Sequence, residues 1–192
     1  MLCRSMVQLA VVVVALVGGR LRAEEIEIGA QAPEFKAQGV NGKEYSLAST
    51  TAAKATVLCF TCNGCPVAVA YEDRFIEFAN QYGGKGVKFI AINGNNATEN
   101  LKAMKQRSEE KGFTFPYAFD ESGDAARAYG ARVTPHIFIV DQSGKIAYRG
   151  AFDDNIKDAK KHYVADAVDA LLAGKTPETT TSKAFGCGIK LK

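Results

Sequence analysis

A pair of cysteines separated by two residues is the part of the sequence best suited to chemistry. Cys62 and Cys65 flank Asn63 and Gly64, and Pro66 follows directly. Two intervening residues allow the sulfurs to meet, so Cys65 can attack a mixed disulfide formed on Cys62 and release the reduced partner. The spacing therefore indicates thiol–disulfide exchange, although metal sites and static disulfides also use it. The sequence has no second ligand pair of the kind that a zinc ribbon needs.

The neighbouring residues predict that the cysteine pair lies between a strand and a helix. Residues 55–60 form a continuous apolar run, as in a strand that is buried on both faces. After Pro66, apolar residues recur at helical spacing up to Gly83 and Gly84. The unpaired N–H groups and partial positive charge of a helix N-terminus favour a thiolate. We therefore expect both sulfurs to be exposed at the leading end of this helix, with Cys62, the outer residue, as the nucleophile.

The rest of the chain alternates expected strands and helices. Residues 24–51 contain short apolar pieces around a turn at 39–42, which predicts an N-terminal β-hairpin. Asn96 is the expected N-cap of a charged helix, with Glu99 completing a capping box. This order predicts a layered α/β domain with a mixed sheet. The remaining expected elements are strands at 87–92, 115–119, 137–140 and 146–148, and helices at 96–112, 121–129 and 164–172.

The first 23 residues have the composition of a secretory signal peptide. Arg4 precedes an uncharged stretch rich in Val and Ala, and the small residue Ala23 stands at the expected cleavage point. The apolar stretch is shorter than the roughly 20 residues that span a bilayer, which favours cleavage over a permanent anchor. We therefore expect an exported protein, periplasmic or otherwise extracytoplasmic, that meets the membrane only through this segment during export.

The positive net charge of the sequence, +3, belongs to this leader. Residues 1–23 contain three arginines and no acidic residue, so the remaining chain has equal numbers of basic and acidic residues. The absence of a basic run argues against nucleic acid as a partner. Four cysteines remain after cleavage, and closely spaced cysteines in an exported protein are expected to be bridged or redox-active.

The expected domain covers residues 24–174 and is followed by a C-terminal tail, residues 175–192. The tail begins with a Thr-rich polar stretch and then places Cys187 between two glycines. After a flexible linker, such a cysteine could swing to the active site and resolve an oxidised Cys62, or it could remain a free thiol. The sequence leaves both interpretations open, and we take the first as a hypothesis. Cys59, within the first buried strand, is expected to pack as a small apolar residue.

A second motif lies about 70 residues beyond the cysteine pair. Thr134 and Pro135 stand just before the apolar strand expected at 137–140. Taken alone, Pro135 could simply begin an edge strand. Together with a cysteine pair at a strand–helix junction, however, the motif resembles the thioredoxin superfamily. The resemblance implies that the Thr134–Pro135 bond is cis, that Pro135 lies against the cysteines, and that the backbone of Thr134 pairs with an incoming peptide as an added strand.

Five segments look more narrowly like the exported redoxin group, a peroxiredoxin-like (AhpC/TSA-like) branch of that superfamily. They are residues 60–66, 70–74, 91–93, 129–135 and 186–190. The resemblance implies an α/β thioredoxin-like fold, with a mixed central sheet flanked by helices and an N-terminal β-hairpin extension. It also implies a thiol–disulfide oxidoreductase that needs no cofactor. Its partners would be protein or small-molecule thiols and disulfides and an electron donor that the sequence does not identify.

Three departures from the thioredoxin pattern bear on the redox poise. Thr61 replaces the Trp that precedes the first cysteine, and Thr56 replaces the buried acid of reducing thioredoxins. No His stands between the cysteines, so the extra thiolate stabilisation of strongly oxidising relatives is also missing. We infer that the Cys62–Cys65 pair has an intermediate or a reducing reduction potential.

Two other functions fit parts of the sequence. A peroxidase motif sets a Thr or Ser three residues before the reactive cysteine and a Pro four before that, and neither cysteine fits this frame. Arg132 or Arg149 could still supply a cation near a thiolate, although each suits an ordinary surface position. A binding module could hold Cu(I) through Cys62 and Cys65, with His136 as a further ligand. His136 equally suits a strand, and we expect no bound metal.

Overall fold

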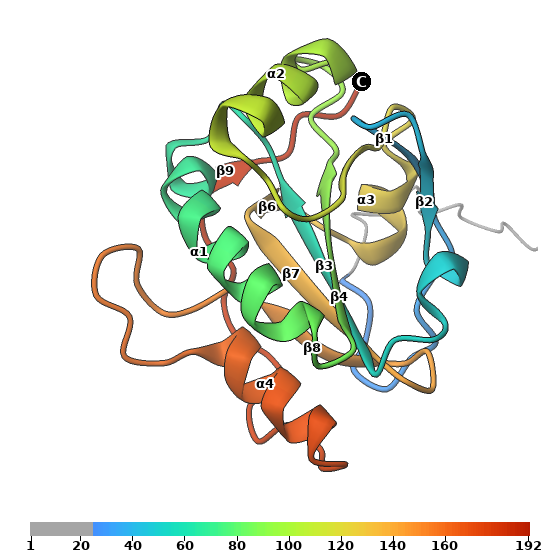
Figure 1. The fold of residues 1–192 in the computed structure, drawn as a ribbon, viewed down its shortest axis with the longest axis vertical. Coiled ribbons are helices and arrows are strands. Elements are labelled where there is room, and N and C mark those ends of the chain that lie inside the picture. The colour runs from blue at the N-terminus through green and yellow to red at the C-terminus, as the bar shows by residue number, and fades with distance from the viewer. Residues whose placement is uncertain (1–24) are drawn as a thin grey trace, which may run out of the picture.

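The computed structural model describes residues 25–192, so the signal peptide expected at 1–23 lies outside the described residues. Seven strands form a central sheet in the order β2-β1-β5-β4-β3-β7-β8, and β6 pairs separately with β9 (Figure 1). The elements are β1 (Lys36–Gly39), β2 (Glu44–Ser46), η1 (Ala48–Thr50), β3 (Ala55–Thr61), α1 (Pro66–Gly83), β4 (Val87–Asn93), α2 (Leu101–Lys111), β5 (Tyr117–Phe119), α3 (Asp124–Tyr129), β6 (Val133–Thr134), β7 (His136–Asp141), β8 (Ile146–Gly150), α4 (Tyr163–Leu172) and β9 (Cys187–Gly188).

The central sheet is mixed. Strands β3, β4 and β5 run parallel, whereas β7 pairs antiparallel with both β3 and β8. The β1–β2 hairpin joins the sheet through β5. The α/β fold with a mixed sheet and an N-terminal hairpin is therefore confirmed. Because Thr61 and Asn93 end β3 and β4 side by side, the residues that follow these two strands meet at one edge of the sheet.

Apolar residues fill both faces of the sheet. Helices α1 and α4 cover one face, where Phe75 of α1 packs on Phe89 of β4. Helix α3 and the N-terminal segment cover the other, where Tyr129 packs on Phe60. Every residue of β3, including Cys59, is buried because both faces are covered, as the continuous apolar run predicts.

Polar residues of α1 hold the neighbouring elements in place. Arg107 donates two hydrogen bonds to the buried carboxylate of Glu72, which fixes α2 against α1. Tyr71 and Arg74 donate to Asp153 at 2.5 and 2.6 Å, which fixes the loop between β8 and α4. These α1 residues belong to one of the redoxin-like segments, which therefore has a structural role.

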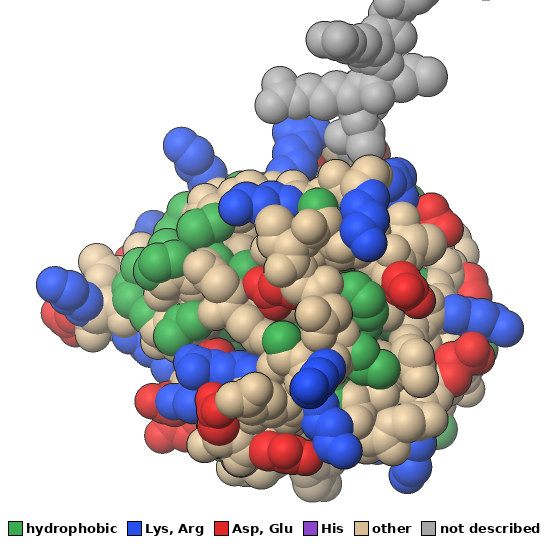
Figure 2. All heavy atoms as spheres, turned by 90° about the horizontal axis from the view of Figure 1, so that it is seen from above, with side chains coloured by type: hydrophobic (Ala, Val, Ile, Leu, Met, Phe, Trp, Pro, Cys, Tyr) green, Lys and Arg blue, Asp and Glu red, His purple; other side chains and the backbone are tan. Residues whose placement is uncertain are grey.

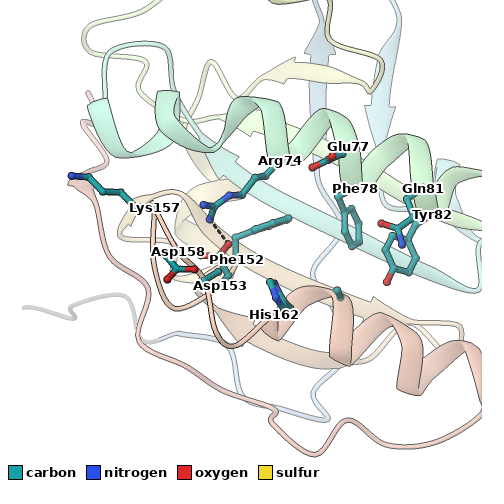
Figure 3. A pocket seen from close by; sticks show the side chains of 12 residues that line it. Arg74, Glu77, Phe78, Gln81, Tyr82, Phe152, Asp153, Lys157, Asp158 and His162 are labelled. Atoms are coloured by element: carbon teal, nitrogen blue, oxygen red, sulfur yellow. Dashed lines mark hydrogen bonds and ion pairs between the residues drawn. The ribbon is translucent and has the colours of Figure 1, made fainter.

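A cavity of about 310 Å³ lies beside this network, between α1, α4 and the loop that precedes α4 (Figure 3). Arg74 points toward Asp153 at one end of the cavity, and Phe78, Phe152 and His162 also line it. No cysteine lines it, so the cavity is separate from the cysteine motif.

The outer surface carries charges of both signs. Basic and acidic side chains are interspersed on the face shown in Figure 2. Among residues 25–192, none of the helices combines the length and the apolar character that a bilayer crossing requires.

Helix α2 begins later than the sequence predicts. Asn100 is its N-cap, and the side chain of Asn100 accepts a hydrogen bond from Ala103 N–H at 3.0 Å. The expected cap, Asn96, instead donates from its side-chain amide to the carbonyl of Glu121. The prediction was wrong because Asn96 and Glu99 both bind distant parts of the chain, which leaves the cap to the next suitable residue.

The C-terminal tail is not the loose linker that its composition suggests. Ser182 N–H donates to the carbonyl of Arg149, and the Ser182 hydroxyl accepts from Ala151 N–H at 2.9 Å. Strand β9 then pairs antiparallel with β6, with Cys187 opposite Thr134, beside the N-terminal end of α1 (Figure 1). Polar composition predicts that a segment is exposed, but it does not show whether the segment pairs with the edge of a strand. This tail pairs with two strand edges, those of β8 and β6.

Candidate active site

The cysteine motif lies at the junction of β3 and α1, as the sequence predicts. Strand β3 ends at Thr61, and Cys65 is the N-cap residue of α1 with Pro66 in the first turn. The carbonyl of Cys65 accepts the N–H of Val69 at 2.9 Å, so Cys65 already belongs to the hydrogen-bonding pattern of the helix. Cys62 stands before the helix, in the turn that leads into it.

The loop around the Thr134–Pro135 bond, called the proline loop from here on, contacts the sulfurs of Cys62 and Cys65 through Thr134. The Thr134–Pro135 peptide bond is cis, as the resemblance implies. Cys62 Sγ lies 3.2 Å from the hydroxyl of Thr134, and the Cys65 thiol donates to the carbonyl of Thr134 at 3.2 Å. The structure therefore brings together Cys62, Cys65 and Thr134. Pro135 follows Thr134 directly in the chain.

Cys187 joins the same cluster from the tail. Its backbone N–H donates to Cys65 Sγ at 3.3 Å, and its carbonyl accepts the Thr134 hydroxyl at 3.5 Å. Its side chain packs against the small cluster of Cys62, Cys65 and Ala68. Cys187 is thus already beside Cys65, whereas the sequence suggested a swing toward Cys62.

Both sulfurs of the pair are buried. Cys62 is 3% exposed and Cys65 is 1% exposed, so the expectation of exposed sulfurs at the leading end of α1 is wrong. The tail contributes to the surroundings of the sulfurs, because β9 pairs with β6 at Thr134 and Cys187 packs against the two cysteines. The backbone of Thr134, which the resemblance assigns to an incoming peptide, is paired with β9 in this structure.

The environment of Cys62 favours the thiol over the thiolate. Burial raises the pKa of Cys62 to about 11, and the negative charge of Glu99 adds to this effect. The hydroxyl of Thr134 acts in the opposite direction but is outweighed. Position before a helix therefore does not by itself give Cys62 the low pKa that the sequence suggests, because its sulfur is shielded from water and lies near a carboxylate.

The environment of Cys65 differs from that of Cys62. Burial acts to raise the pKa of Cys65, but hydrogen bonds from the Cys187 thiol and from Ala68 N–H outweigh it, so the pKa is lowered. The pKa of Cys187 is correspondingly raised, because its thiol donates to Cys65. The local contacts of Cys65 therefore favour its thiolate, whereas those of Cys62 favour its thiol.

Glu99 is the site residue that the sequence analysis missed. Its carboxylate accepts the backbone N–H groups of Asn63 and Gly64, each at 3.0 Å, and the side-chain amide of Asn93 at 2.7 Å. The two backbone donors are the residues between the cysteines. The position of Glu99 was in principle predictable, because residues that follow two adjacent parallel strands meet at the same sheet edge.

Tyr117 extends this network to the side chain of Asn63. Its hydroxyl donates to Asn63 Oδ1 at 2.8 Å and accepts from Asn93 at 3.0 Å. Burial, and then the charge of Glu99, raise the pKa of Tyr117, so its hydroxyl keeps its proton and remains a donor. The turn between the cysteines is therefore fixed through both its backbone and its side chain.

The other candidate residues lie in different surroundings. His136 is buried in β7, and its Nδ1 accepts the N–H of Arg132 at 3.4 Å. Arg149 donates to the carbonyls of Glu25 and Ile26 at 2.7 and 2.5 Å, and Arg132 Nη1 lies 3.9 Å from the carboxylate of Glu25. Within residues 25–192, no group of three or more His, Cys, Asp or Glu side chains has an arrangement that could hold a metal ion.

A thioredoxin-like fold with a cysteine pair at a strand–helix junction, next to a cis-proline loop, defines the class of this protein. The model of the AhpC/TSA family matches residues 28–149, and the chain belongs to this family. Thiol-disulfide oxidoreductase ResA of Bacillus thuringiensis subsp. konkukian is 30% identical over 128 residues, which are 65% of this chain and 70% of ResA. ResA of Geobacillus thermodenitrificans is 27% identical over 124 residues, 63% of this chain and 67% of that relative. The chain is accordingly a thioredoxin-like thiol–disulfide oxidoreductase.

Solved structures share the fold. A hypothetical protein from Sinorhizobium meliloti is 34% identical, with a TM-score of 0.82 over 88% of this chain and 97% of that chain. An uncharacterized conserved protein from Geobacillus kaustophilus is 36% identical, with a TM-score of 0.81 over 86% and 93%. A thiol:disulfide interchange protein of the thioredoxin family from Chlorobium tepidum is 21% identical, with a TM-score of 0.60 over 79% and 99%, and shows the fold alone.

Proposed function

We propose that this chain exchanges disulfides through Cys62 and Cys65 in an extracytoplasmic compartment. The contact of both sulfurs with Thr134 is the observation that supports the proposal most. Cys62 Sγ meets the hydroxyl and Cys65 Sγ meets the carbonyl, each at 3.2 Å. One residue of the proline loop thus holds both sulfurs in one small cluster, where the two-residue spacing allows a disulfide to close.

The reaction follows the usual course of thiol–disulfide exchange. The thiolate of Cys62 attacks a client disulfide, and one client sulfur leaves and takes up a proton. Cys65 then attacks Cys62 Sγ, the Cys62–Cys65 bond forms, and the second client thiol leaves. The client gains two electrons and the protein loses two, which an external dithiol donor returns. Clients are protein or small-molecule disulfides.

The raised pKa of Cys62 supports a reducing poise. A stabilised thiolate favours the reduced form of a cysteine pair and makes its disulfide a strong oxidant. Burial and the charge of Glu99 act the other way here, because they destabilise the Cys62 thiolate. We therefore expect the pair to donate electrons to clients rather than to accept them.

A thiol peroxidase is the second candidate, because the chain belongs to the AhpC/TSA family. Against it, the contacts of Arg149 and Arg132 with the N-terminal segment at Glu25 occupy the two cations that the sequence offered for a peroxidatic thiolate. Stopped-flow mixing of the reduced protein with hydrogen peroxide separates the two activities. A rapid second-order oxidation of Cys62 or Cys65 would favour the peroxidase over disulfide exchange.

Turnover of a model disulfide tests the main proposal. With glutathione disulfide as substrate and a dithiol as donor, Cys62→Ser and Cys65→Ser should each lower turnover by about 100-fold or more in a chain that also carries Cys187→Ser, because the Cys62–Cys65 disulfide can no longer close. Cys59→Ala in the same background is the matched control, since Cys59 packs in the main apolar core. Unchanged turnover when Cys62→Ser is added to this background would refute the proposal.

The extracytoplasmic location rests on the composition of residues 1–23. Mass spectrometry of the protein from its native host should find a mature chain that begins at Glu24 outside the cytoplasm. A chain that keeps residues 1–23 and fractionates with the cytoplasm would refute this part of the proposal without touching the chemistry.

A further inference from the structure

The C-terminal tail occupies the edge where an external peptide would pair. Strand β9 adds to β6 as an antiparallel strand, with Val133 opposite Gly188 and Thr134 opposite Cys187. The N–H of Ile189 also donates to the carbonyl of Arg132 at 2.9 Å. Strand addition at this loop is the mode of peptide recognition that the resemblance to the thioredoxin superfamily implies. The tail therefore lies where a client strand would lie, with a cysteine at the position nearest the pair.

We propose that Cys187 is a third redox cysteine, and that the tail is an internal substrate which exchanges with Cys65 and must leave β6 before an external client binds. The proposal rests on the proposed function of Cys62 and Cys65. It differs from the sequence hypothesis in its target, because the structure places Cys187 against Cys65.

Two glycines permit the tail to approach so closely. A Cβ on Gly186 would collide with the carbonyl oxygen of Thr134, and Gly186 has a φ of 144°. A Cβ on Gly150 would lie 2.6 Å from the backbone oxygen of Ser182, and Gly150 has a φ of 146°. Gly186 lies in the tail and Gly150 ends β8. The lack of a side chain on each side therefore lets the tail backbone lie close to the rest of the domain.

The tail is anchored on both sides of Cys187. Before it, the hydroxyl of Ser182 contacts the Tyr148 hydroxyl at 2.7 Å. After it, the backbone N–H groups of Lys190 and Lys192 donate to Asn95 and Asn96, each at 2.8 Å. The side chains of Ile189 and Leu191 pack against the core on the α3 side of the sheet. These contacts fix the register of β9, and this register places Cys187 next to Cys65.

The exchange conserves electrons within the chain. When Cys62 and Cys65 form a disulfide, the Cys187 thiolate attacks Cys65 Sγ. The Cys65–Cys187 bond forms, the Cys62–Cys65 bond breaks, and Cys62 leaves as a thiolate that takes up the proton lost by Cys187. The step moves a disulfide without net oxidation and leaves Cys62 as the free thiol.

The first test uses the full chain with Cys62→Ser. Glutathione disulfide added to the reduced variant should oxidise Cys65 and Cys187 to one disulfide and release two molecules of glutathione. Peptide mapping should then find Cys65 linked to Cys187 in most of the protein. A stable glutathione adduct on either cysteine, with no Cys65–Cys187 link, would overturn the proposal.

Two further variants separate this proposal from the proposed function. In Cys187→Ser, glutathione disulfide should still produce the Cys62–Cys65 disulfide, which peptide mapping detects, whereas in Cys62→Ser only the Cys65–Cys187 link can form. A Cys187→Ser chain that forms no Cys62–Cys65 disulfide would contradict the proposed function, while the Cys65–Cys187 link in Cys62→Ser decides the present proposal. Gly186→Ala should displace β9, lower Cys65–Cys187 formation about tenfold, and raise the rate of exchange with a cysteine-containing peptide disulfide severalfold. Gly83→Ala is the matched control, because a Cβ there meets open space. Wild-type behaviour of Gly186→Ala in both assays would overturn the docking role of the tail.

Discussion

The carboxylate of Glu99 accepts the backbone N–H of Gly64 at 3.0 Å, directly between the two cysteines of the motif. The same carboxylate binds the N–H of Asn63. The two backbone N–H groups that precede α1 therefore donate to the carboxylate of Glu99 and not to a cysteine thiolate. This arrangement counters the effect by which a helix N-terminus lowers a cysteine pKa.

Removal of the charge at position 99 should make Cys62 more acidic. Glu99→Gln keeps a hydrogen-bond acceptor for the turn but deletes the negative charge that raises the pKa of Cys62. We expect the alkylation rate of Cys62 at pH 7 to rise by about threefold to tenfold, because a larger fraction is thiolate. Glu109→Gln, at an exposed position on α2, is the control. An unchanged or slower Cys62 rate in Glu99→Gln would show that the charge has no such effect.

The reactivity of Cys62 should depend steeply on pH. With a pKa of about 11, the thiolate fraction is small at neutral pH and grows about tenfold for each pH unit below that value. Iodoacetamide labelling of Cys62, measured by peptide mass spectrometry between pH 7 and 10, should follow this slope. A plateau below pH 9 would mean that the thiolate is better stabilised than the structure indicates.

Acid should destabilise the fold through His136. Burial lowers the pKa of His136 to about 4, and the charges of Arg132 and Arg149 add to the effect. The unfolded chain binds this proton near pH 6.5, so the stabilising contribution is complete above pH 6.5 and is lost as the pH falls toward 4. We expect a loss of about 2 kcal/mol in the free energy of unfolding between pH 7 and pH 5.

Urea unfolding at these two pH values measures the effect. His136→Phe should remove this part of the pH dependence, because Phe suits a buried strand position and binds no proton. If the variant and the original chain lose equal stability between pH 7 and pH 5, another group causes the acid sensitivity.

The network around Asp153 should stabilise the fold without taking part in exchange. Asp153 is 2% exposed and accepts a hydrogen bond from Tyr71. It also accepts one from Arg74, which Figure 3 shows. Arg74→Ala leaves a buried carboxylate without its cation, a loss that costs roughly 3–5 kcal/mol in other proteins. Urea unfolding should show a decrease of this order, while glutathione disulfide turnover per folded molecule stays unchanged. Lys157→Ala, elsewhere on the cavity wall, is the control.

Local sequence patterns predicted the fold well because each element carries its own signal. The apolar run of β3, the helical spacing of α1 and the turn of the β1–β2 hairpin all depend on neighbouring residues. The junction that holds Cys62 and Cys65 follows from these signals. The proximity of Thr134 required the resemblance, because no local pattern brings together residues so far apart in the chain.

The parts that the sequence missed depend on contacts between distant segments. Asn96 and Glu99 suit a capping box, but both follow β4, whose end lies beside the cysteine motif and the tail. There Glu99 binds the backbone of Asn63, and Asn96 binds the backbone of Glu121 and Lys192. The polar tail appeared to be a linker because its backbone hydrogen bonds are invisible in its composition. The pKa of Cys62 was misjudged because burial of its sulfur and the charge of Glu99 outweigh the position near a helix.

The reduction potential of the Cys62–Cys65 pair tests the account most directly. The protein should be equilibrated with mixtures of reduced and oxidised glutathione, alkylated, and mapped by mass spectrometry. We predict that a Cys62–Cys65 disulfide forms reversibly with a potential below about −220 mV, in the range of reducing thioredoxin-like proteins. A pair that never forms this disulfide, or that forms it near −120 mV as strong oxidants do, would contradict the account.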